Sequence, residues 1–177
     1  AAVITNIGLE HKKTLGATKS LIAKEKAGII KKDCKAFTME KLPRIRKVPE
    51  TEAKKVKASF QYVEPNFEIV SQEIGRTIYM YDGSEFELGL LGSHQIKNAV
   101  LATRVAQSFG ISVATIKKGL KKAVLRNRME LVDNKILHIF DTAHNKYKIA
   151  SSVETLLNFP ELADKKIRLL VGLSADK

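Results

Sequence analysis

The sequence predicts an α/β protein with parallel sheets, because apolar β-prone runs alternate with helical patterns in two parts of the chain. Residues 1–39 give the order strand, helix, strand, and the same order restarts after about Arg126. A composition of 44% hydrophobic and 28% charged residues is that of an ordinary folded globular protein.

The first strand, helix and second strand follow from local patterns. "AAVITNIG" is an apolar run without alternation, which is typical of a strand buried on both faces of a parallel sheet. The next helix is expected to begin near Thr18, whose hydroxyl can cap it, and to end near Ile30. "CKAFTM" then predicts a second short strand.

The middle of the chain changes from a helical to a two-residue period. A polar stretch containing Pro43 and Pro49 precedes "ETEAKKVKASF", which favours a short helix. From Phe60 onward, "FEIVSQ", "TIYMYDG" and "EFELGLLG" predict strands, with Asp82-Gly83 as a tight hairpin turn.

Two helices and a second β-α-β pattern follow. "HQIKNAVLATRVAQSFG" predicts a helix ended by Gly110, and Ser112 can cap the next helix. "LRNRMELVDNKILHIFD" predicts two strands, Asn145 a helix cap, and "IRLLVG" a further buried strand. We therefore expect a domain boundary near Arg126, giving domains 1–125 and 126–177.

Charge and composition restrict the function classes. The net charge of +12, from 31 Lys and Arg against 19 Asp and Glu, favours anionic partners of any kind. A single cysteine, Cys34, excludes an internal disulfide. No apolar run approaches the roughly 20 residues that span a bilayer, so we expect a cytoplasmic protein without a membrane partner. The sequence has neither a glycine-lysine-serine/threonine phosphate loop nor a G-x-G-x-x-G motif.

The first group of candidate site residues follows the opening strand. On a helical wheel, Lys26 lies in the middle of the apolar face of "LIAKEKAGIIKK", and Asn6, Glu10 and His11 lie upstream. A buried lysine amine has a lowered pKa and can take up carbon dioxide, and the carbamate is an oxygen ligand for a hard divalent metal. Alternatively, the Lys26 stem packs on the core while its amine reaches solvent, and the histidine is structural.

Two further groups lie where predicted strands end, which is where parallel α/β sheets bind ligands. In "LLGSHQIKNA", Asn98 follows His94 by one helical turn, and an amide can pair with both edges of a base. In "FDTAHN", Asp141 and His144 flank a strand-to-helix turn suited to an anion, with Arg128 upstream. Helix-cap polarity without a ligand is the alternative for the second group.

Taken together, these segments resemble the folylpolyglutamate synthase and dihydrofolate synthase branch of the Mur ligase family. "TNIGLEH", "IAKEKAGIIK", "LGSHQIKNA", "RMELV", "DTAHN" and "VGLSADK" occur in that family's order and approximate spacing, over nearly all 177 residues. The resemblance implies the second half of a P-loop-type parallel-sheet ATPase domain, followed by the first part of a Rossmann-like C-terminal domain. It also implies a chain taken from the middle of a longer enzyme, which alone would not turn over ATP.

The implied activity is ATP-dependent joining of L-glutamate to a folate or pteroate carboxylate through an acyl phosphate. The resemblance implies that a carbamylated Lys26 and His11 hold a magnesium ion, Asn98 contacts adenine, and Asp141 holds the ribose. Arg128 and His144 would reach the phosphates. The expected partners are ATP, L-glutamate and the folate or pteroate, with the full-length protein a monomer.

Several positions depart from the family pattern. Glu10 replaces an aspartate, Arg126-Asn127 replaces Pro-Gly, Thr142 replaces a glycine and Lys146 a proline. These departures leave open a catalytically inactive homologue with a structural or binding role. The charge leaves open a basic nucleic-acid-binding module, although aromatic residues make up only 6% and no stacking platform is evident.

Overall fold

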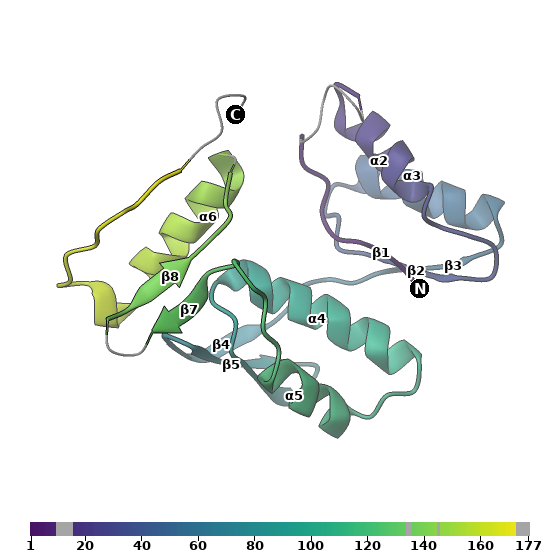
Figure 1. Cartoon of the computed structure of the whole chain (residues 1–177). Coiled ribbons are helices and arrows are strands. Elements are labelled where there is room, and N and C mark those ends of the chain that lie inside the picture. Colours follow the sequence, from purple (N-terminus) through teal and green to yellow (C-terminus); the bar gives the residue numbers. More distant parts are fainter. Residues whose placement is uncertain (10–15, 134–135, 145, 173–177) are drawn as a thin grey trace. The chain divides into compact units, whose positions relative to one another are not determined.

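A computed structural model describes residues 1–9, 16–133, 136–144 and 146–172 of the chain (Figure 1). The chain divides into two compact units. The first comprises Ala1–Asn66 with Leu101–Gly110, and the second comprises Phe67–Val100 with Ile111–Lys177. Helix α4 (Ser93–Ser108) contributes residues to both units.

The first unit contains a three-stranded parallel sheet in the order β1-β2-β3. Strands β1 (Ala2–Ile4), β2 (Lys35–Thr38) and β3 (Ser59–Tyr62) are connected through helices α2 (Lys19–Ala27) and α3 (Pro43–Lys55). Thr18 caps α2 as predicted, because its hydroxyl accepts a hydrogen bond from the Leu21 amide at 3.2 Å. The prediction of a mixed α/β fold with a parallel sheet is therefore confirmed.

Helices α2 and α3 cover the same face of the sheet of the first unit, as Figure 1 shows. The core between them joins small and β-branched side chains of β1, β2, α2, α3 and the adjoining loops, namely Ala2, Ile4, Ile7, Ile22, Ala23, Ala27, Ile30, Ala36, Ile45 and Ala53. The many alanines allow the helices to approach the sheet closely.

Two expectations for this unit were wrong, and one strand was missed. Strand β1 is buried on one face only, because Val3 is 39% exposed between buried Ala2 and Ile4. Helix α3 begins at Pro43, where the missing amide proton costs nothing, and continues through Pro49, which is buried. The third parallel strand, β3, was not predicted, because four residues are too few to show a period.

A buried carboxylate fixes the loop that follows β1. Glu40 is 4% exposed, and its two oxygens accept hydrogen bonds from the Ile7 amide at 2.8 Å and the Leu42 amide at 2.9 Å. The Thr38 hydroxyl donates to the Thr5 carbonyl at 3.2 Å. The carboxyl ends of β1 and β2 are thus held together by side chains as well as by the sheet.

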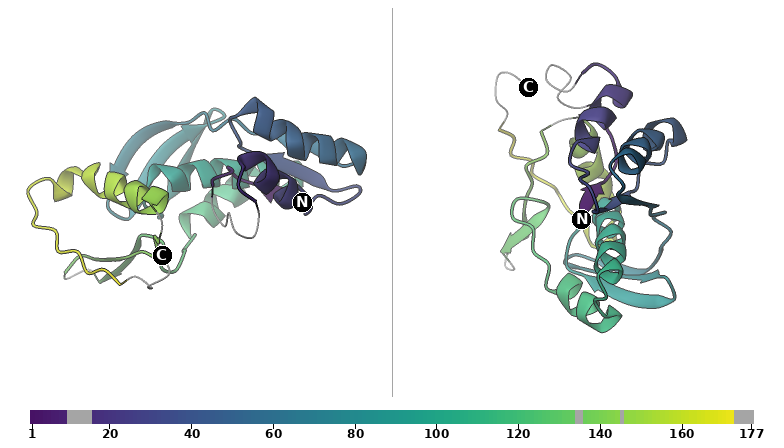
Figure 2. Two further views of the ribbon diagram at one scale, coloured as in Figure 1. Left: turned by 90° about the horizontal axis from the view of Figure 1, so that it is seen from above. Right: turned by 90° about the vertical axis from the view of Figure 1, so that its right-hand side faces the viewer.

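The second unit begins with an antiparallel sheet of β4 (Glu68–Glu73), β5 (Arg76–Tyr81) and β6 (Ser84–Leu88), seen again in Figure 2. All three strands were predicted. Asp82 and Gly83 have φ angles of 49° and 68°, which is the left-handed geometry of the predicted hairpin turn.

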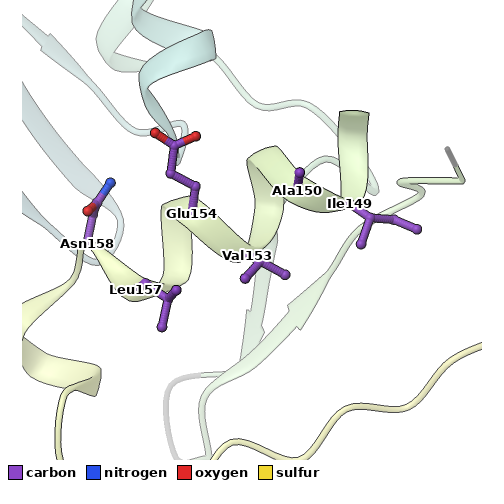
Figure 3. Close-up of a pocket in the computed structure, with 6 residues that line it drawn as sticks. All are labelled: Ile149, Ala150, Val153, Glu154, Leu157 and Asn158. Carbon is purple, nitrogen blue, oxygen red and sulfur yellow. The ribbon is translucent and has the colours of Figure 1, made fainter. Parts of the chain in front are cut away.

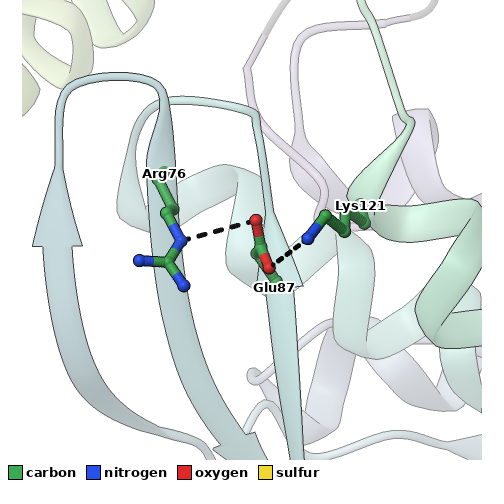
Figure 4. Close-up of polar contacts among 3 residues, drawn as sticks. All are labelled: Arg76, Glu87 and Lys121. Carbon is green, nitrogen blue, oxygen red and sulfur yellow. Dashed lines mark hydrogen bonds and ion pairs between the residues drawn. The ribbon is translucent and has the colours of Figure 1, made fainter.

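Helix α5 (Val113–Lys121) packs beside β6 and begins at Ser112, which caps it as predicted. Figure 4 shows how a single carboxylate links it to the sheet. Glu87 accepts from Lys121 Nζ at 2.9 Å and from Arg76 Nε at 3.4 Å. The hydrogen bond from Lys121 is the main reason that the pKa of Glu87 lies below its usual range.

The rest of the second unit is the hairpin of β7 (Glu130–Asp133) and β8 (His138–Phe140), followed by α6 (Lys146–Leu157) and a short 3-10 helix, η1 (Pro160–Leu162). Buried Leu91, Met129 and Phe159 form its core. The predicted cap of α6, Asn145, lies outside the described residues.

The predicted buried strand "IRLLVG" is wrong for this structure. Residues 167–172 form no strand, and Leu169 and Leu170 are 80% and 101% exposed. A strand must pair its backbone groups with a neighbour, and in the described chain β8 pairs only with β7. Within the described residues, the longest apolar stretch in any helix is too short to cross a membrane.

Candidate functional site

A pair of backbone contacts brings the segment that carries Arg128 to the end of β8. The Asn127 carbonyl accepts from both the amide and the hydroxyl of Thr142, each at 3.0 Å. The Asn127 amide donates to Glu130 Oε2 at 2.7 Å. Arg128 follows Asn127 and Asp141 precedes Thr142, so the two predicted site residues lie near the same contact.

Two of the departures from the family pattern are the two partners in this contact. Asn127, where the family has glycine, has a φ angle of 56°, a left-handed conformation that asparagine tolerates better than most residues. Thr142, also at a glycine position of the family, supplies the hydroxyl that bonds Asn127. Because the acceptor is the Asn127 backbone carbonyl, the added hydrogen bond comes from the Thr142 hydroxyl and not from the Asn127 side chain.

Asp141 is held from both sides at the carboxyl end of β8. Its Oδ1 accepts from the Ala143 amide at 3.2 Å, in a local turn that the short aspartate side chain can close. Its Oδ2 accepts from the hydroxyl of Ser152, in α6. Each carboxylate oxygen can accept a second hydrogen bond, so this aspartate can still accept from a ligand hydroxyl.

His94 packs against α6 at the start of α4. Its Nδ1 lies 3.1 Å from the Ser151 hydroxyl. Gly92, at a φ angle of 100°, lies beneath the imidazole, because a Cβ on this residue would come within 2.7 Å of His94 Cε1 and 2.8 Å of Thr155 Oγ1. Glycine is required here both for its backbone conformation and for the close approach.

Burial and several charges act on the pKa of His94. Burial is the main cause that lowers the pKa of His94 below its ordinary value of 6.5. The charges of Lys97 and Arg128 lower this pKa further, whereas that of Asp141 opposes the shift. We call His94, Arg128, Asp141, Ser151 and Ser152 the His94–Asp141 cluster.

His144 lies between β8 and α6 with both ring nitrogens in contact. Nδ1 lies 2.8 Å from the Thr142 carbonyl, so this nitrogen carries the proton. Nε2 lies 3.3 Å from Lys148 Nζ, one helical turn further on. Together they place an imidazole and an ammonium group at the start of α6, an arrangement that favours an anion.

Asn98 lies on the exposed surface of α4, one turn after His94. Its Nδ2 donates to Oε1 of Gln95 at 3.2 Å, and Gln95 is buried. The buried glutamine therefore orients the Asn98 amide, as a residue that contacts a base would require.

The inward orientation predicted for Lys26 was wrong. The buried face of α2 consists of Ile22, Ala23 and Ala27, whereas Lys26 is exposed. Ile29, which bounded the predicted apolar arc on one side, is 52% exposed, and Leu21 is 49% exposed. The helix ends at Ala27, so the apolar arc is not continued around Lys26, and a cation in the last turn complements the helix dipole.

The predicted magnesium site is not built by the described residues. His11 and Glu10 lie outside them, and Lys26 is exposed. Within the described part of the chain, no three histidine, cysteine or acidic side chains are placed to hold a metal.

A shallow apolar pocket lies along α6 and is separate from the polar groups above. It is lined by Ile149, Ala150, Val153, Glu154, Leu157 and Asn158. Figure 3 shows Ile149, Val153 and Leu157 along one side of the helix, with Glu154 and Asn158 pointing to the other. This pocket offers apolar surface and little chemistry.

Sequence reasoning missed Ser151, Ser152 and Lys148. Lys148 follows His144 by four residues, a spacing that could have suggested the contact. The serines could not have been found from sequence, because Ser151 meets a residue 57 positions away.

No family model matches the chain. It is similar to the dihydrofolate synthase/folylpolyglutamate synthase of Bacillus subtilis (strain 168), with 30% identity over 193 residues that cover 99% of this chain and 43% of that protein. A solved point mutant of L. casei FPGS matches with a TM-score of 0.81 and 25% identity, over 97% of this chain and 44% of the other.

The Mycobacterium tuberculosis folylpolyglutamate synthase, solved in complexes with ADP and AMPPCP, matches with a TM-score of 0.72 and 29% identity. It is matched over 88% of this chain and 38% of its own. The chain thus spans about two fifths of the length of the relatives it matches.

Proposed function

Since the chain is a relative of the folylpolyglutamate and dihydrofolate synthases, in the Mur ligase family, we propose that it carries part of the ATP site of such a ligase. The reaction is the ATP-dependent joining of L-glutamate to a folate or pteroate carboxylate. In the same proposal, residues 1–125 belong to the second half of the ATPase domain and 126–177 to the first part of the Rossmann-like C-terminal domain.

The observation that carries the proposal is the His94–Asp141 cluster. In this cluster Ser152 of α6 donates to the Asp141 carboxylate at the end of β8, and Ser151 contacts His94, whose pKa responds to the charges of both Asp141 and Arg128. Asp141 would accept hydrogen bonds from the ribose hydroxyls, and Arg128 would pair with phosphate oxygens. His144 and Lys148 would reach the phosphates, with Lys148 adding positive charge, while Asn98 would contact adenine.

These groups suit a reaction that proceeds through an acyl phosphate. The folate or pteroate carboxylate oxygen attacks the γ-phosphorus of ATP, and ADP leaves with the electron pair of the broken P–O bond. The amine of glutamate then attacks the acyl carbon and loses a proton, and inorganic phosphate leaves as the amide forms. Arg128 would stabilise the charge that develops on the transferred phosphoryl group.

Binding of AMPPCP to the native protein, measured by calorimetry, tests the proposal. We expect Arg128→Ala to weaken binding at least tenfold, because a hydrogen bond between charged partners contributes about 1.5–3 kcal/mol. The control is Arg44→Ala, which removes an exposed arginine from α3. A native protein that binds no AMPPCP, or an Arg128→Ala variant that binds as tightly as wild type, would refute it.

A catalytically inactive relative is the second candidate, and the exposure of Lys26 favours it. The family resemblance implies that the lysine at this position holds a metal. The exposed side chain of Lys26 in this structure does not fit that role. An inactive relative would still bind AMPPCP through the His94–Asp141 cluster, but it would form no γ-glutamyl product. Product formation therefore separates the two candidates.

A further inference from the structure

Two consecutive serines of α6 hold side chains that come from different elements. The Ser151 hydroxyl lies 3.1 Å from Nδ1 of His94, at the start of α4. The Ser152 hydroxyl donates to Oδ2 of Asp141, at the end of β8. Consecutive residues of a helix point about 100° apart, so one helix can hold both neighbours at once.

The Ser152 hydroxyl has a choice of acceptors. Besides Asp141, its oxygen lies 3.0 Å from the Lys148 carbonyl, a bond that any serine in a helix can make. A hydroxyl has one proton, and the bond to a carboxylate is the stronger of the two. The serine hydroxyl does not need Asp141 as an acceptor, so we infer that the contact serves to fix the carboxylate.

The contact on the other side is equally constrained. Gly92 leaves no space for a methyl group beneath the His94 ring, and the Thr155 hydroxyl closes the same space from α6. The Thr155 hydroxyl donates to the Ser151 carbonyl at 2.7 Å. His94 is thus confined between the Gly92 backbone and α6, with Ser151 as its hydrogen-bond partner.

We propose that Ser151 and Ser152 are positioning residues of the nucleotide site, which fix His94 and Asp141 in the arrangement that receives the ribose and phosphates. The inference rests on the proposed function. It adds that α6 sets the position of Asp141 through Ser152, a residue outside the motif "DTAHN".

The test compares two changes at Ser152 with opposite effects on the helix. Ser152→Ala removes the hydroxyl but introduces the best helix-forming residue, whereas Ser152→Thr keeps a hydroxyl with a lower helix propensity. In the native protein we expect Ser152→Ala to raise the KM for ATP and the Kd for AMPPCP about tenfold, with kcat changed less than about threefold. Ser152→Thr should remain within about threefold of wild type.

The matched control is Ser20→Ala, the same change at an exposed position of α2. It should leave the KM for ATP unchanged. If Ser152 only stabilised the helix, Ser152→Thr would instead show the larger increase in the KM for ATP, because threonine disfavours the helix. That order, or an unchanged KM in Ser152→Ala, would overturn the inference while leaving the proposed function intact.

A measurement without nucleotide separates the two claims. We expect Ser151→Ala to shift the NMR signals of the His94 ring, while Ser20→Ala does not. Unchanged His94 signals in Ser151→Ala would overturn the inference. If wild type binds no AMPPCP at all, the proposed function fails, and the role of the serines in nucleotide binding fails with it.

Discussion

The buried hydroxyl of Tyr79 is a weak point of the second unit. Tyr79 is fully buried, its ring stacks on Phe86 with centroids 5.5 Å apart, and Phe67 meets its edge. Burial raises the pKa of this tyrosine well above its usual value. Among the residues that the structure describes, none donates to or accepts from its hydroxyl.

We therefore expect Tyr79→Phe to raise the free energy of unfolding by about 1 kcal/mol, because it removes an unpaired polar group without changing the ring. Chemical denaturation measures this. Tyr79→Leu, which loses the ring contacts as well, should destabilise the protein. A loss of stability in Tyr79→Phe would mean that the hydroxyl is bonded, for example to an internal water.

His94 should make stability depend on pH. The unfolded imidazole takes up a proton near its ordinary pKa of 6.5, whereas the folded imidazole, whose pKa burial lowers, stays neutral until the pH is lower. Just below pH 6.5 the unfolded state therefore binds more protons, and the free energy of unfolding decreases as the pH falls. Denaturation between pH 5 and 7 should show a smaller slope in His94→Gln than in wild type, and equal slopes would contradict the assignment.

Lys26 separates a role in activity from a role in folding. Because its side chain is exposed, Lys26→Ala should change the free energy of unfolding by less than about 0.5 kcal/mol. The family resemblance implies a metal role for the matching lysine, and if Lys26 has that role in the native protein its removal should lower ligase activity at least tenfold. Lys24→Ala, an exposed lysine of the same helix, is the control. Full activity in Lys26→Ala would rule out the carbamate.

At the scale of elements, the junction of α4 with α6 depends on Gly92. A Cβ at Gly92 would clash with His94 and Thr155, in addition to the cost of a φ angle of 100°. Gly110 has a φ angle of 77°, but a methyl group added there would have nothing within 4 Å, so this glycine carries the conformational cost alone.

We expect Gly92→Ala to reduce the free energy of unfolding by about 3 kcal/mol or more, and Gly110→Ala by about 1 kcal/mol. Thermal or chemical denaturation measures the loss of stability in each variant. The difference between the two losses is the contribution of the close packing at Gly92. Equal losses in the two variants would show that α4 and α6 are not in close contact at this glycine.

Most elements could be predicted from the sequence because their signals are local. The caps at Thr18 and Ser112 and the Asp82-Gly83 turn need only neighbouring residues, and all three were confirmed. The failures have non-local causes. Pro49 is buried inside α3, a position that local propensity does not predict, and "IRLLVG" forms no strand without a pairing partner.

The candidate site shows the same division. The residue types and the motif order were enough to recognise the family, and Arg128 and Asp141 were both chosen as candidates. The contacts of Ser151 with His94 and of Ser152 with Asp141 form only when α4, β8 and α6 pack together. Helical periodicity placed Lys26 inward because the wheel extended the helix to Ile30, beyond its end at Ala27.

At the scale of the whole molecule, the chain matches about two fifths of each relative and carries a net charge of +12. Such a positive charge raises the local concentration of ATP, of glutamate and of folates alike, and its effect should weaken as salt increases. The charge does not select among these anions. Selection requires sites such as the His94–Asp141 cluster.

The most direct test of the ligase assignment is ATP-dependent incorporation of labelled L-glutamate into a folate or pteroate acceptor by the native protein. We expect incorporation that requires ATP and that falls at least tenfold in Asp141→Ala. A native protein that binds AMPPCP but incorporates no glutamate with either acceptor would contradict the ligase assignment and leave an inactive relative.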